Sequence, residues 1–423
     1  MLSRDDRRLA DRDGEIPDLA VVLDPTAVAD WIRRAAGTVT RIGATHVRYK
    51  PGTSCVVGYE VTTPSGTRLV FAKAVRAADA HKVDKAVEKA VGDVDAGWDV
   101  VRCSERCAYV ATALNDRDLP SARTLADPAA RQRLLDRLLP TAEDPGDRRL
   151  RAIRHKPERR WVGVVDVDGR PAHRFKAYRP VDVARAHAGH AVVGATWAAP
   201  TAWSRRRGVI VSPWIDGASM ADALVGGGDV DAWALGASLA ELHGRPPAPR
   251  VRTIRERELR RGLRSAVAAV EHVLPGLGPT AQRIARRAGR VVREDAQRSP
   301  IHGDLSADQV VLTTDGLHLI DFDDAANGQP AADLASFAAD LLCAEVGGRV
   351  RPGRCAEVTA DLLEGYRHAG GRVDPTTLDA HLSRALLHRA VEPFRARRPH
   401  WRAECEQIVE AAIEPERRGV VGR

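Results

Sequence analysis

The chain has 423 residues but lacks any long hydrophobic run and is poor in aromatic side chains. No apolar stretch approaches the ~18 residues of a membrane-spanning helix, and residues 1–15 are too charged for a secretory signal. Five Phe and five Tyr are too few for an obvious base-stacking platform. We therefore expect neither a membrane nor a nucleic acid as partner, and interpret the net charge of +8 as an arginine-rich solvated surface.

Cysteine is sparse as well. The six cysteines are scattered along a long chain, which is typical of reduced thiols inside the cell and not of a disulfide framework. Cys103 and Cys107 have no second Cys pair or His pair at zinc spacing nearby. We therefore predict a cytoplasmic protein of roughly two to three domains without a structural zinc site.

Lysine is also in short supply. Only seven of the 65 basic residues are lysines, so arginine supplies the charge wherever charge alone is enough. A compact ammonium and a planar guanidinium are not interchangeable. The few positions that hold a lysine are therefore informative.

Four of these lysines mark an internal repeat. Residues 46–76 and 153–179 both predict a strand, a Lys-Pro turn, a second strand, a Gly-containing turn and a third strand that ends in Phe-x-Lys or Phe-Lys. Each copy continues into a helical stretch and a further strand pair, so the repeat is about a hundred residues long and covers a small β-rich lobe. The lysines pair as Lys50 with Lys156 and Lys73 with Lys176.

The most informative stretch is SPIHGDLSADQVVLTTDGLHLIDFDD, residues 299–324. Asp304 lies in a His-Gly-Asp loop, Gln309 follows five residues later, and Asp321 follows seventeen residues after Asp304. QVVL and LHLID predict two short strands joined by the turn residues 314–316. The hairpin is expected to bring Asp321 back beside the other two side chains.

Those three side chains match the needs of phosphoryl transfer. One carboxylate can orient an attacking hydroxyl group, while a second carboxylate and an amide oxygen hold Mg²⁺ on the phosphates of a nucleotide. His-Gly-Asp alone would mean little, because it occurs in ordinary turns. The combination with the amide, the hairpin and the second acid predicts a catalytic site.

The same residues resemble the catalytic and metal loops of the aminoglycoside phosphotransferase and choline kinase family, small-molecule kinases with a protein-kinase-like fold. The usual pattern is HGDxxxxN followed by IDFD or IDWE, and it stands here as HGDLSADQ and IDFD. Gln309 replaces the asparagine, as in maltokinase-like relatives, although Ser306 and Asp308 replace the His and Gly found between in those. Glutamine keeps the amide oxygen with one more methylene, so we interpret the chain as an active variant.

The resemblance implies an α+β, protein-kinase-like fold of two lobes, a small β-rich N-lobe and a helical C-lobe. We predict an N-lobe over residues 146–216 and a C-lobe with the catalytic hairpin over 217–423. Residues 1–145 become an additional lobe that looks like a duplicated N-lobe. The polar segment 141–149 is the predicted linker between the two copies.

The resemblance also implies roles for single residues, with ATP and Mg²⁺ as cofactors. Asp304 is the expected catalytic residue. The expected metal ligands are Gln309, Asp321 and Asp323. The expected nucleotide contacts are Lys176, which grips phosphates, Lys156 in a turn without glycine, and the hinge residues Pro213, Trp214, Ile215 and Asp216.

The partner of the phosphate lysine stays open. Glu88 follows Lys73 on a predicted helix, whereas only Asp182 follows Lys176, although Lys176 is connected directly to the hinge. Asp333 is expected to brace the loop or cap a helix, and His302 to be structural.

The acceptor also stays open. Residues 381–402 are notably basic, which favours a neutral or anionic small molecule with a hydroxyl group, such as a sugar, over a polycationic aminoglycoside. The first alternative is an inactive pseudokinase that binds a nucleotide or a protein partner. A metal-dependent hydrolase is less favoured because a second cluster of His or Asp ligands is lacking.

Overall fold

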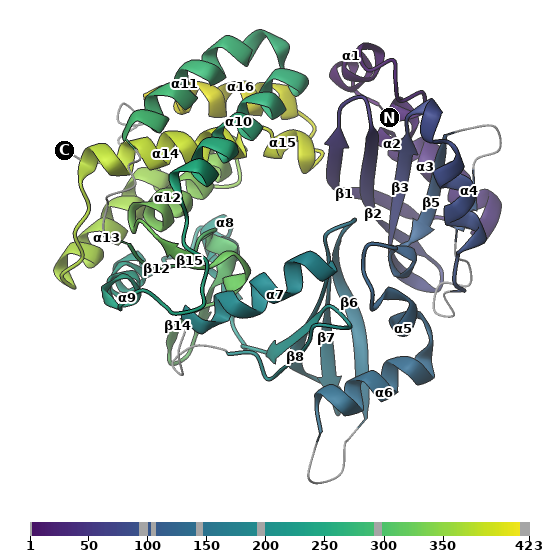
Figure 1. Ribbon diagram of the computed structural model, residues 1–423, viewed down its shortest axis with the longest axis horizontal. Coiled ribbons are helices and arrows are strands. Elements are labelled where there is room, and N and C mark those ends of the chain that lie inside the picture. Colours follow the sequence, from purple (N-terminus) through teal and green to yellow (C-terminus); the bar gives the residue numbers. More distant parts are fainter. Residues whose placement is uncertain are drawn as a thin grey trace. The chain divides into compact units, whose positions relative to one another are not determined.

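The computed structural model describes residues 2–92, 100–102, 107–140, 147–192, 199–291 and 298–414. Cys103 and most of the predicted linker, residues 141–146, lie outside this range. The chain forms two compact units, coloured along the sequence in Figure 1. The first unit contains Met1–Ala184, Pro200–Trp214 and Phe394–Pro399, and the second contains Arg185–Ala199, Ile215–Pro393 and His400–Arg423.

The first unit contains two antiparallel five-stranded sheets with the same topology. The strand orders are β1-β2-β3-β5-β4 and β6-β7-β8-β10-β9. The first sheet consists of β1 (Arg41–Lys50), β2 (Ser54–Thr63), β3 (Gly66–Val75), β4 (Val100–Arg102) and β5 (Ala108–Thr112). The second consists of β6 (Arg148–Lys156), β7 (Arg160–Val167), β8 (Arg170–Tyr178), β9 (Ala202–Ser204) and β10 (Val209–Pro213).

The register of the strands places the two repeat lysines at equivalent positions. Lys73 on β3 lies opposite Val56 of β2, and Lys176 on β8 lies opposite Val162 of β7. In both copies this valine is six residues beyond the lysine of the Lys-Pro turn. The sheets therefore repeat down to the pairing of single residues.

A matching pair of helices precedes each sheet. The first pair is α2 (Leu19–Leu23) and α3 (Pro25–Ala36), and the second is α5 (Ala122–Ala126) and α6 (Pro128–Leu138). In each pair the second helix begins with Pro and has an aspartate N-cap, whose side chain accepts a backbone N–H of the first turn. Proline is well suited to the first helical position, and aspartate is a favoured N-cap.

A further aspartate, upstream of each helix pair, binds the first turn of the following sheet. In the first copy Asp13 Oδ2 accepts hydrogen bonds from the Tyr49 hydroxyl at 2.6 Å and from the Gly52 N–H at 2.9 Å. Gly52 has a φ of 62°, a left-handed conformation that glycine adopts without steric cost.

The second copy repeats this arrangement with other side chains. Asp116 Oδ2 is hydrogen-bonded to His155 Nε2 at 2.9 Å and accepts the Glu158 N–H at 2.7 Å. Glu158 has a φ of 57°, so it adopts the conformation of its glycine counterpart. The structural repeat therefore extends over residues 13–112 and 116–213.

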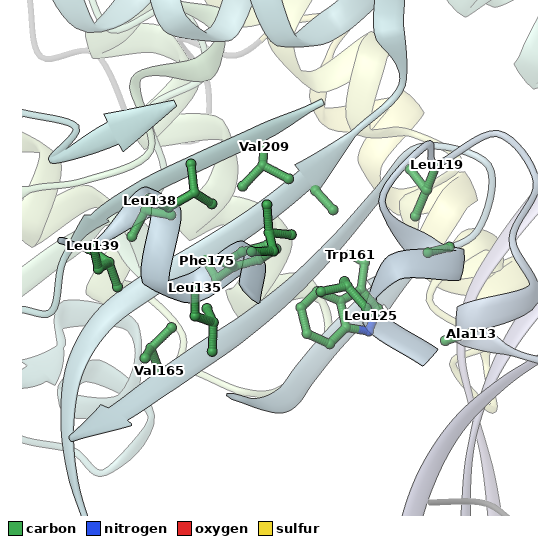
Figure 2. Packing of buried hydrophobic residues seen from close by; sticks show 14 residues of the cluster. Ala113, Leu119, Leu125, Leu135, Leu138, Leu139, Trp161, Val165, Phe175 and Val209 are labelled. Atoms are coloured by element: carbon green, nitrogen blue, oxygen red, sulfur yellow. The ribbon is translucent and has the colours of Figure 1, made fainter. Parts of the chain in front are cut away.

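Helices α5 and α6 pack on the second sheet, although they lie inside the predicted first lobe. Figure 2 shows Leu135 and Leu138 of α6 beside Phe175 and Val165 of the sheet, in one buried cluster. Burying such side chains contributes roughly 1.5–3 kcal/mol each. The cores of the two copies therefore divide near residue 115 and not near residue 145.

The remaining helices of the first unit are α1 (Arg4–Arg12), α4 (His81–Glu88) and the start of α7 (Pro180–Gly189). A late segment, Phe394–Pro399, also belongs to this unit. Arg397 donates hydrogen bonds to both carboxylate oxygens of Asp6, at 2.7 and 2.8 Å, and one to Leu23 O at 3.3 Å. Since Asp6 is buried, this bidentate pair fixes α1 to the late segment.

The second unit is mainly helical, which confirms the predicted α+β fold with a β-rich N-terminal and a helical C-terminal part. Among the described residues, no helix is both long and apolar enough to cross a membrane. The helices are α8 (Met220–Val225), α9 (Ala232–Gly244), α10 (Glu256–Val273), α11 (Gly278–Val291), α12 (Ala331–Val346), α13 (Arg354–His368), α14 (Pro375–Arg389), α15 (Glu392–Arg395) and α16 (Trp401–Ala411). The strands are β11 (Ala218–Ser219), β12 (Ser299–Ile301), β13 (Val310–Thr313), β14 (Gly316–Leu319) and β15 (Ala326–Gly328).

Candidate active site

Two strand pairs bring the His-Gly-Asp loop and the second acidic loop together. Strand β13 pairs with β14 as the predicted hairpin, and β12 pairs with β15, with Ile301 opposite Ala326. One loop runs from β12 to β13 and the other from β14 to β15, so both start and end at the same two strand pairs. A hydrogen bond of 2.9 Å from Ile320 N to Gln309 O joins them where they leave the hairpin.

Gly303 lies where the two loops touch. Its φ is 88°, and a Cβ atom at this position would lie 2.3 Å from Asp324 O. Both the left-handed backbone and the close approach require glycine. The glycine of the His-Gly-Asp motif therefore allows Asp304 to lie next to the acidic loop.

Asp333, at the start of α12, braces the His-Gly-Asp loop as predicted. One of its carboxylate oxygens accepts the His302 N–H at 2.6 Å, and the other accepts the Gly303 N–H at 2.8 Å. His243 Nε2 lies 3.1 Å from the same carboxylate, and His243 Nδ1 lies 3.1 Å from the Tyr366 hydroxyl. Burial alone would raise the pKa of Asp333, but the hydrogen bonds and the charge of His243 hold it below its ordinary value.

His302 has the structural role that its position predicts. Its Nε2 lies 2.9 Å from Ile320 O, and its ring packs on that of Phe322 with centroids 4.7 Å apart. The side chain is fully buried. His302 therefore connects the two loops.

Asp304 points toward solvent. Its side chain is 60% exposed, and its Oδ1 lies 3.8 Å from Arg389 Nη2 of α14. Arg389 is also hydrogen-bonded to Ser336 Oγ at 3.1 Å. An exposed carboxylate on a braced loop is available to an incoming hydroxyl group.

Gln309, an expected metal ligand, forms part of a short capped turn. Its Oε1 accepts the Ser306 N–H at 3.2 Å, while the Ser306 hydroxyl caps the turn in return. An amide oxygen has two lone pairs, so this contact leaves room for a second partner. The structure thus gives Gln309 a bracing contact, and its role as a metal ligand stays a prediction.

Asp321 has the unusual backbone of the acidic loop. Its φ is 71°, and it precedes the short 3₁₀ turn Phe322–Asp324. A left-handed aspartate is rare, and such strain gathers at functional sites. The described residues contain no group of three or more His, Cys, Asp or Glu that could hold a metal ion. Mg²⁺ needs only one or two carboxylates besides water and phosphate oxygens, so Asp321 with Gln309 has the right chemistry for it.

The other two acids of this loop have basic neighbours. Asp323 is 6% exposed, and its Oδ1 lies 3.8 Å from His190 Nε2. Asp324 is 40% exposed, and its Oδ1 lies 3.2 Å from Arg185 Nη1. Arg252 also donates to Asp324 O at 2.9 Å. Asp323 as a metal ligand remains a prediction.

The lysine of the first copy is engaged by the second copy. Lys73 Nζ lies 2.5 Å from Glu158 Oε1, and Arg48 Nη1 lies 2.9 Å from Glu158 Oε2. Glu88, the partner considered from the sequence, is exposed. Lys73 therefore pairs with Glu158 and not with Glu88, because the β6–β7 turn places the Glu158 carboxylate next to it.

The lysine of the second copy is more deeply placed. Lys176 is 4% exposed on the central strand β8. Asp182, the only nearby acid expected from the sequence, is hydrogen-bonded to Arg179 at 2.7 Å. Lys156 is half-buried in the β6–β7 turn. Their roles as phosphate contacts stay predictions, since both belong to the first unit and the acidic loops to the second.

The predicted hinge lies where the chain passes between the units. Pro213 ends β10, and Trp214 N donates to Ala172 O at 2.9 Å. Trp214 is the last residue of the first unit at this crossing, and Ile215 is the first of the second. Contacts of Pro213 to Asp216 with an adenine ring remain a prediction.

Sequence reasoning missed several residues of these clusters. Asp116 precedes the cap Asp127 by the same interval as Asp13 precedes Asp24, and His155 precedes its Lys-Pro turn as Tyr49 does. A longer repeat comparison could therefore have found both. Glu158 and Arg389 carry no local signal, because their partners are far away in the sequence.

Comparisons with known proteins agree with the loops described above. Residues 169–369 match the phosphotransferase enzyme family, a span that includes both loops and Asp333. This match confirms the family resemblance and the predicted enzyme class, a small-molecule phosphotransferase. No curated protein matches the chain.

Several solved structures resemble the chain at low identity. A spectinomycin phosphotransferase in complex with ADP and spectinomycin is 15% identical, over 67% of this chain and 97% of that one, with a TM-score of 0.47. An aminoglycoside phosphotransferase from Streptomyces rimosus is 19% identical, over 62% and 98%, with a TM-score of 0.46. A choline/ethanolamine kinase family protein from Mesorhizobium loti is 15% identical, over 71% and 96%, with a TM-score of 0.46.

Proposed function

Because residues 169–369 match the phosphotransferase enzyme family, we propose that this protein transfers the γ-phosphoryl group of ATP to a hydroxyl group of a small molecule. The observation that carries the proposal is the close packing of the two loops. Gly303 brings the catalytic loop against the backbone of Asp324, and Asp333 holds it there by two backbone N–H groups.

Asp304 orients the acceptor and receives its proton. The acceptor oxygen forms a bond to the γ-phosphorus as the bond from that phosphorus to the bridging oxygen of ADP breaks. The hydroxyl proton passes to the Asp304 carboxylate, which is exposed and can release it to water. Positioning and electrostatic stabilisation supply most of the rate in such reactions.

Gln309 and Asp321 hold the metal ion. Mg²⁺, when bound, neutralises the charge that develops on the phosphates. The left-handed backbone of Asp321 presents its carboxylate at the end of the hairpin. Asp323 supports the same loop from its buried position beside His190.

Lys176 binds the phosphates, with Lys156 as a second cation, and Pro213 to Asp216 bind the adenine through backbone groups. The assignment to Lys176 is supported by its place on β8, which pairs with β10 directly before the hinge.

An inactive, nucleotide-binding pseudokinase is the second candidate. The engagement of Gln309 Oε1 by the Ser306 N–H favours it, because that oxygen is the expected metal ligand. Thermal unfolding separates it from a protein that binds no nucleotide, since a ligand that binds only the folded state raises the unfolding temperature.

The test is ATP turnover with Mg²⁺ by the purified protein against sugars, amino alcohols and aminoglycosides. Asp304→Asn is the matched variant, since it removes the charge and keeps the shape. We expect acceptor-dependent release of ADP that the variant lowers by at least ~100-fold. Equal turnover by the variant would refute the role of Asp304. No turnover with any acceptor, together with a rise in the unfolding temperature on addition of Mg·ATP, would support the pseudokinase.

A further inference from the structure

Arg389 lies beside the exposed carboxylate of Asp304, and the charges of Arg252, Arg389 and Asp304 all act on Arg384. Arg252 precedes α10, and Arg384 and Arg389 lie on α14. Arg389 Nη2 is 3.8 Å from Asp304 Oδ1. Arg384 is close enough to the other two arginines and to Asp304 for their charges to affect its pKa. The hydroxyl acceptor must therefore approach Asp304 through a basic environment.

Arg384 is the least satisfied member of this cluster. Its Nε atom is buried and has no hydrogen-bond partner among the residues that the structure describes. Burial, with the charges of Arg389 and Arg252, lowers the pKa of Arg384 to about 10. A guanidinium with this pKa is still charged at neutral pH, so a bound anion would stabilise it.

Arg252 is only partly satisfied as well. Its Nη2 donates to Asp324 O at 2.9 Å and lies 3.9 Å from Asp324 Oδ1. Its Nε is buried and lacks a hydrogen-bond partner within the described part of the chain. An unpaired buried donor is costly, so these two unpaired Nε atoms indicate a missing acceptor.

The carboxylates near these arginines are engaged elsewhere or act mainly on Arg389. Asp324 is shared with Arg185, at 3.2 Å. Asp340 accepts the Ala307 N–H at 3.1 Å, and its charge, like that of Glu392, acts on Arg389. Asp304 is the acid whose charge acts on Arg384. The Nε atoms of Arg384 and Arg252 still lack an acceptor in the described part of the chain.

A water molecule is the competing explanation for Arg384. A cavity of about 20 Å³ lies between Arg384, His381 and Gln329, which is room for about one water molecule. Burial and the charge of Arg384 lower the pKa of His381 to about 3, so its ring is neutral. A ligand could enter this cavity with at most one oxygen atom.

We propose that Arg384, with Arg252 beside it, binds an oxyanion of the acceptor, so that the substrate is a hydroxyl compound that carries a carboxylate or phosphate group. This inference rests on the proposed function, because it names the substrate class of the same site. A guanidinium donates charge-assisted hydrogen bonds to oxyanions, and one oxygen atom of such a group fits the cavity beside Arg384. The same charges disfavour a polycationic acceptor.

The substrate class can be tested with three acceptors that share one ring. D-Glucuronate, D-glucose and D-glucosamine carry a negative, a neutral and a positive substituent. We expect turnover to rank in that order. In Arg384→Gln the KM for D-glucuronate should rise at least ~10-fold, with the KM for ATP unchanged and with partial recovery in Arg384→Lys. A preference for D-glucosamine, or an effect confined to the KM for ATP, would overturn the proposal.

A binding measurement covers the case in which none of the three sugars is an acceptor. Inorganic phosphate at 20 mM should raise the unfolding temperature of the wild-type protein by about 3 °C, and Arg384→Gln should lose most of this shift. Arg264→Gln is the control, since Arg264 is exposed on α10 of the same unit. Equal shifts in all three proteins, or no shift in any, would refute the anion site. A variant that loses stability but keeps the shift would indicate the water instead.

The two proposals fail in different ways. Phosphate binding that depends on Arg384, in a protein without any turnover, would refute the proposed function and leave the anion site. Turnover on neutral or cationic acceptors that does not depend on Arg384 would refute the anion site and support the proposed function.

Discussion

The two copies of the repeat differ at the turn between their first two strands. In the first copy the turn holds Gly52, and in the second it holds Glu158, with nearly the same left-handed φ of 62° and 57°. The left-handed conformation costs roughly 1–2 kcal/mol for a residue with a side chain. The second copy accepts this cost, and its glutamate side chain reaches Lys73 of the first copy.

The difference shows that equivalent positions of the two copies serve different contacts. Lys73 and Lys176 have the same register in the two sheets, but Lys73 is paired with Glu158 and therefore joins the copies. Glu158 stands where the first copy has Gly52, which has no side chain for such a contact. The equivalent lysine, Lys176, remains the candidate for phosphate binding.

The strongest test of the difference between the two lysines is to replace each of them in turn. Lys176→Met should lower kcat/KM for ATP turnover by roughly 100-fold, because it removes the proposed phosphate contact. Lys73→Met should leave turnover within about 3-fold, because its charge is already neutralised. Steady-state kinetics on both variants decides this, with unfolding temperatures as the control for folding. The reverse ranking would assign the phosphate lysine to the first copy.

The contact between the copies can be tested at Glu158. Glu158→Gln keeps the strained backbone and removes the charge, so it should lower the free energy of unfolding by about 3 kcal/mol. Glu158→Gly also loses the ion pairs but relieves the backbone, so it should be less destabilising by about 1–2 kcal/mol. Urea unfolding of both variants measures the difference. A glutamine variant as stable as the wild type would show that the ion pairs contribute nothing.

The pair of Asp6 and Arg397 has no counterpart among the contacts described for the second copy, and its contribution depends on pH. Burial would raise the pKa of Asp6, but the hydrogen bonds and charge of Arg397 hold it below the ordinary value. A lowered pKa stabilises the fold above the unfolded-state pKa of about 4, and this stabilisation is lost as the pH falls through the folded-state pKa. Asp6→Asn should therefore cost about 2 kcal/mol at pH 7 and much less near pH 3. A constant difference from pH 7 to pH 3 would contradict this.

The smallest effect on stability is expected from replacing one of two matched helix caps. Asp24 caps α3 and Asp127 caps α6 at equivalent positions of the two copies. Replacing either aspartate by alanine should cost about 1 kcal/mol, measured by urea unfolding. Equal losses would support equivalent helix pairs. A difference of more than ~1 kcal/mol would show that one copy has come to depend on its cap more than the other.

The local parts of the candidate site could be predicted from the sequence. The hairpin follows from two apolar strands and a Thr-Asp-Gly turn, and its loops start and end at adjacent strands. The bracing by Asp333 was also predicted, because the acid follows the hairpin closely in the sequence. Interactions within one supersecondary element are encoded in nearby residues.

The long-range parts could not be predicted. The start of each copy was missed, because the helix pair keeps little more than an Asp-Pro step, at Asp24 and Asp127, and an upstream aspartate. The partner of Lys73 was sought on the next helix, but it comes from the other copy, 85 residues away. Such a contact depends on how two sheets pack, and no local pattern reports that.

The short segment that carries Arg397 has a consequence for synthesis. It completes the first unit, yet it leaves the ribosome after nearly all of the second unit. Asp6 and Leu23 must wait for a partner made almost 400 residues later, at about 5–20 residues per second. A chain released early would contain both sheets and both loops but lack this closing contact. The last step of folding therefore depends on translation having gone nearly to the end.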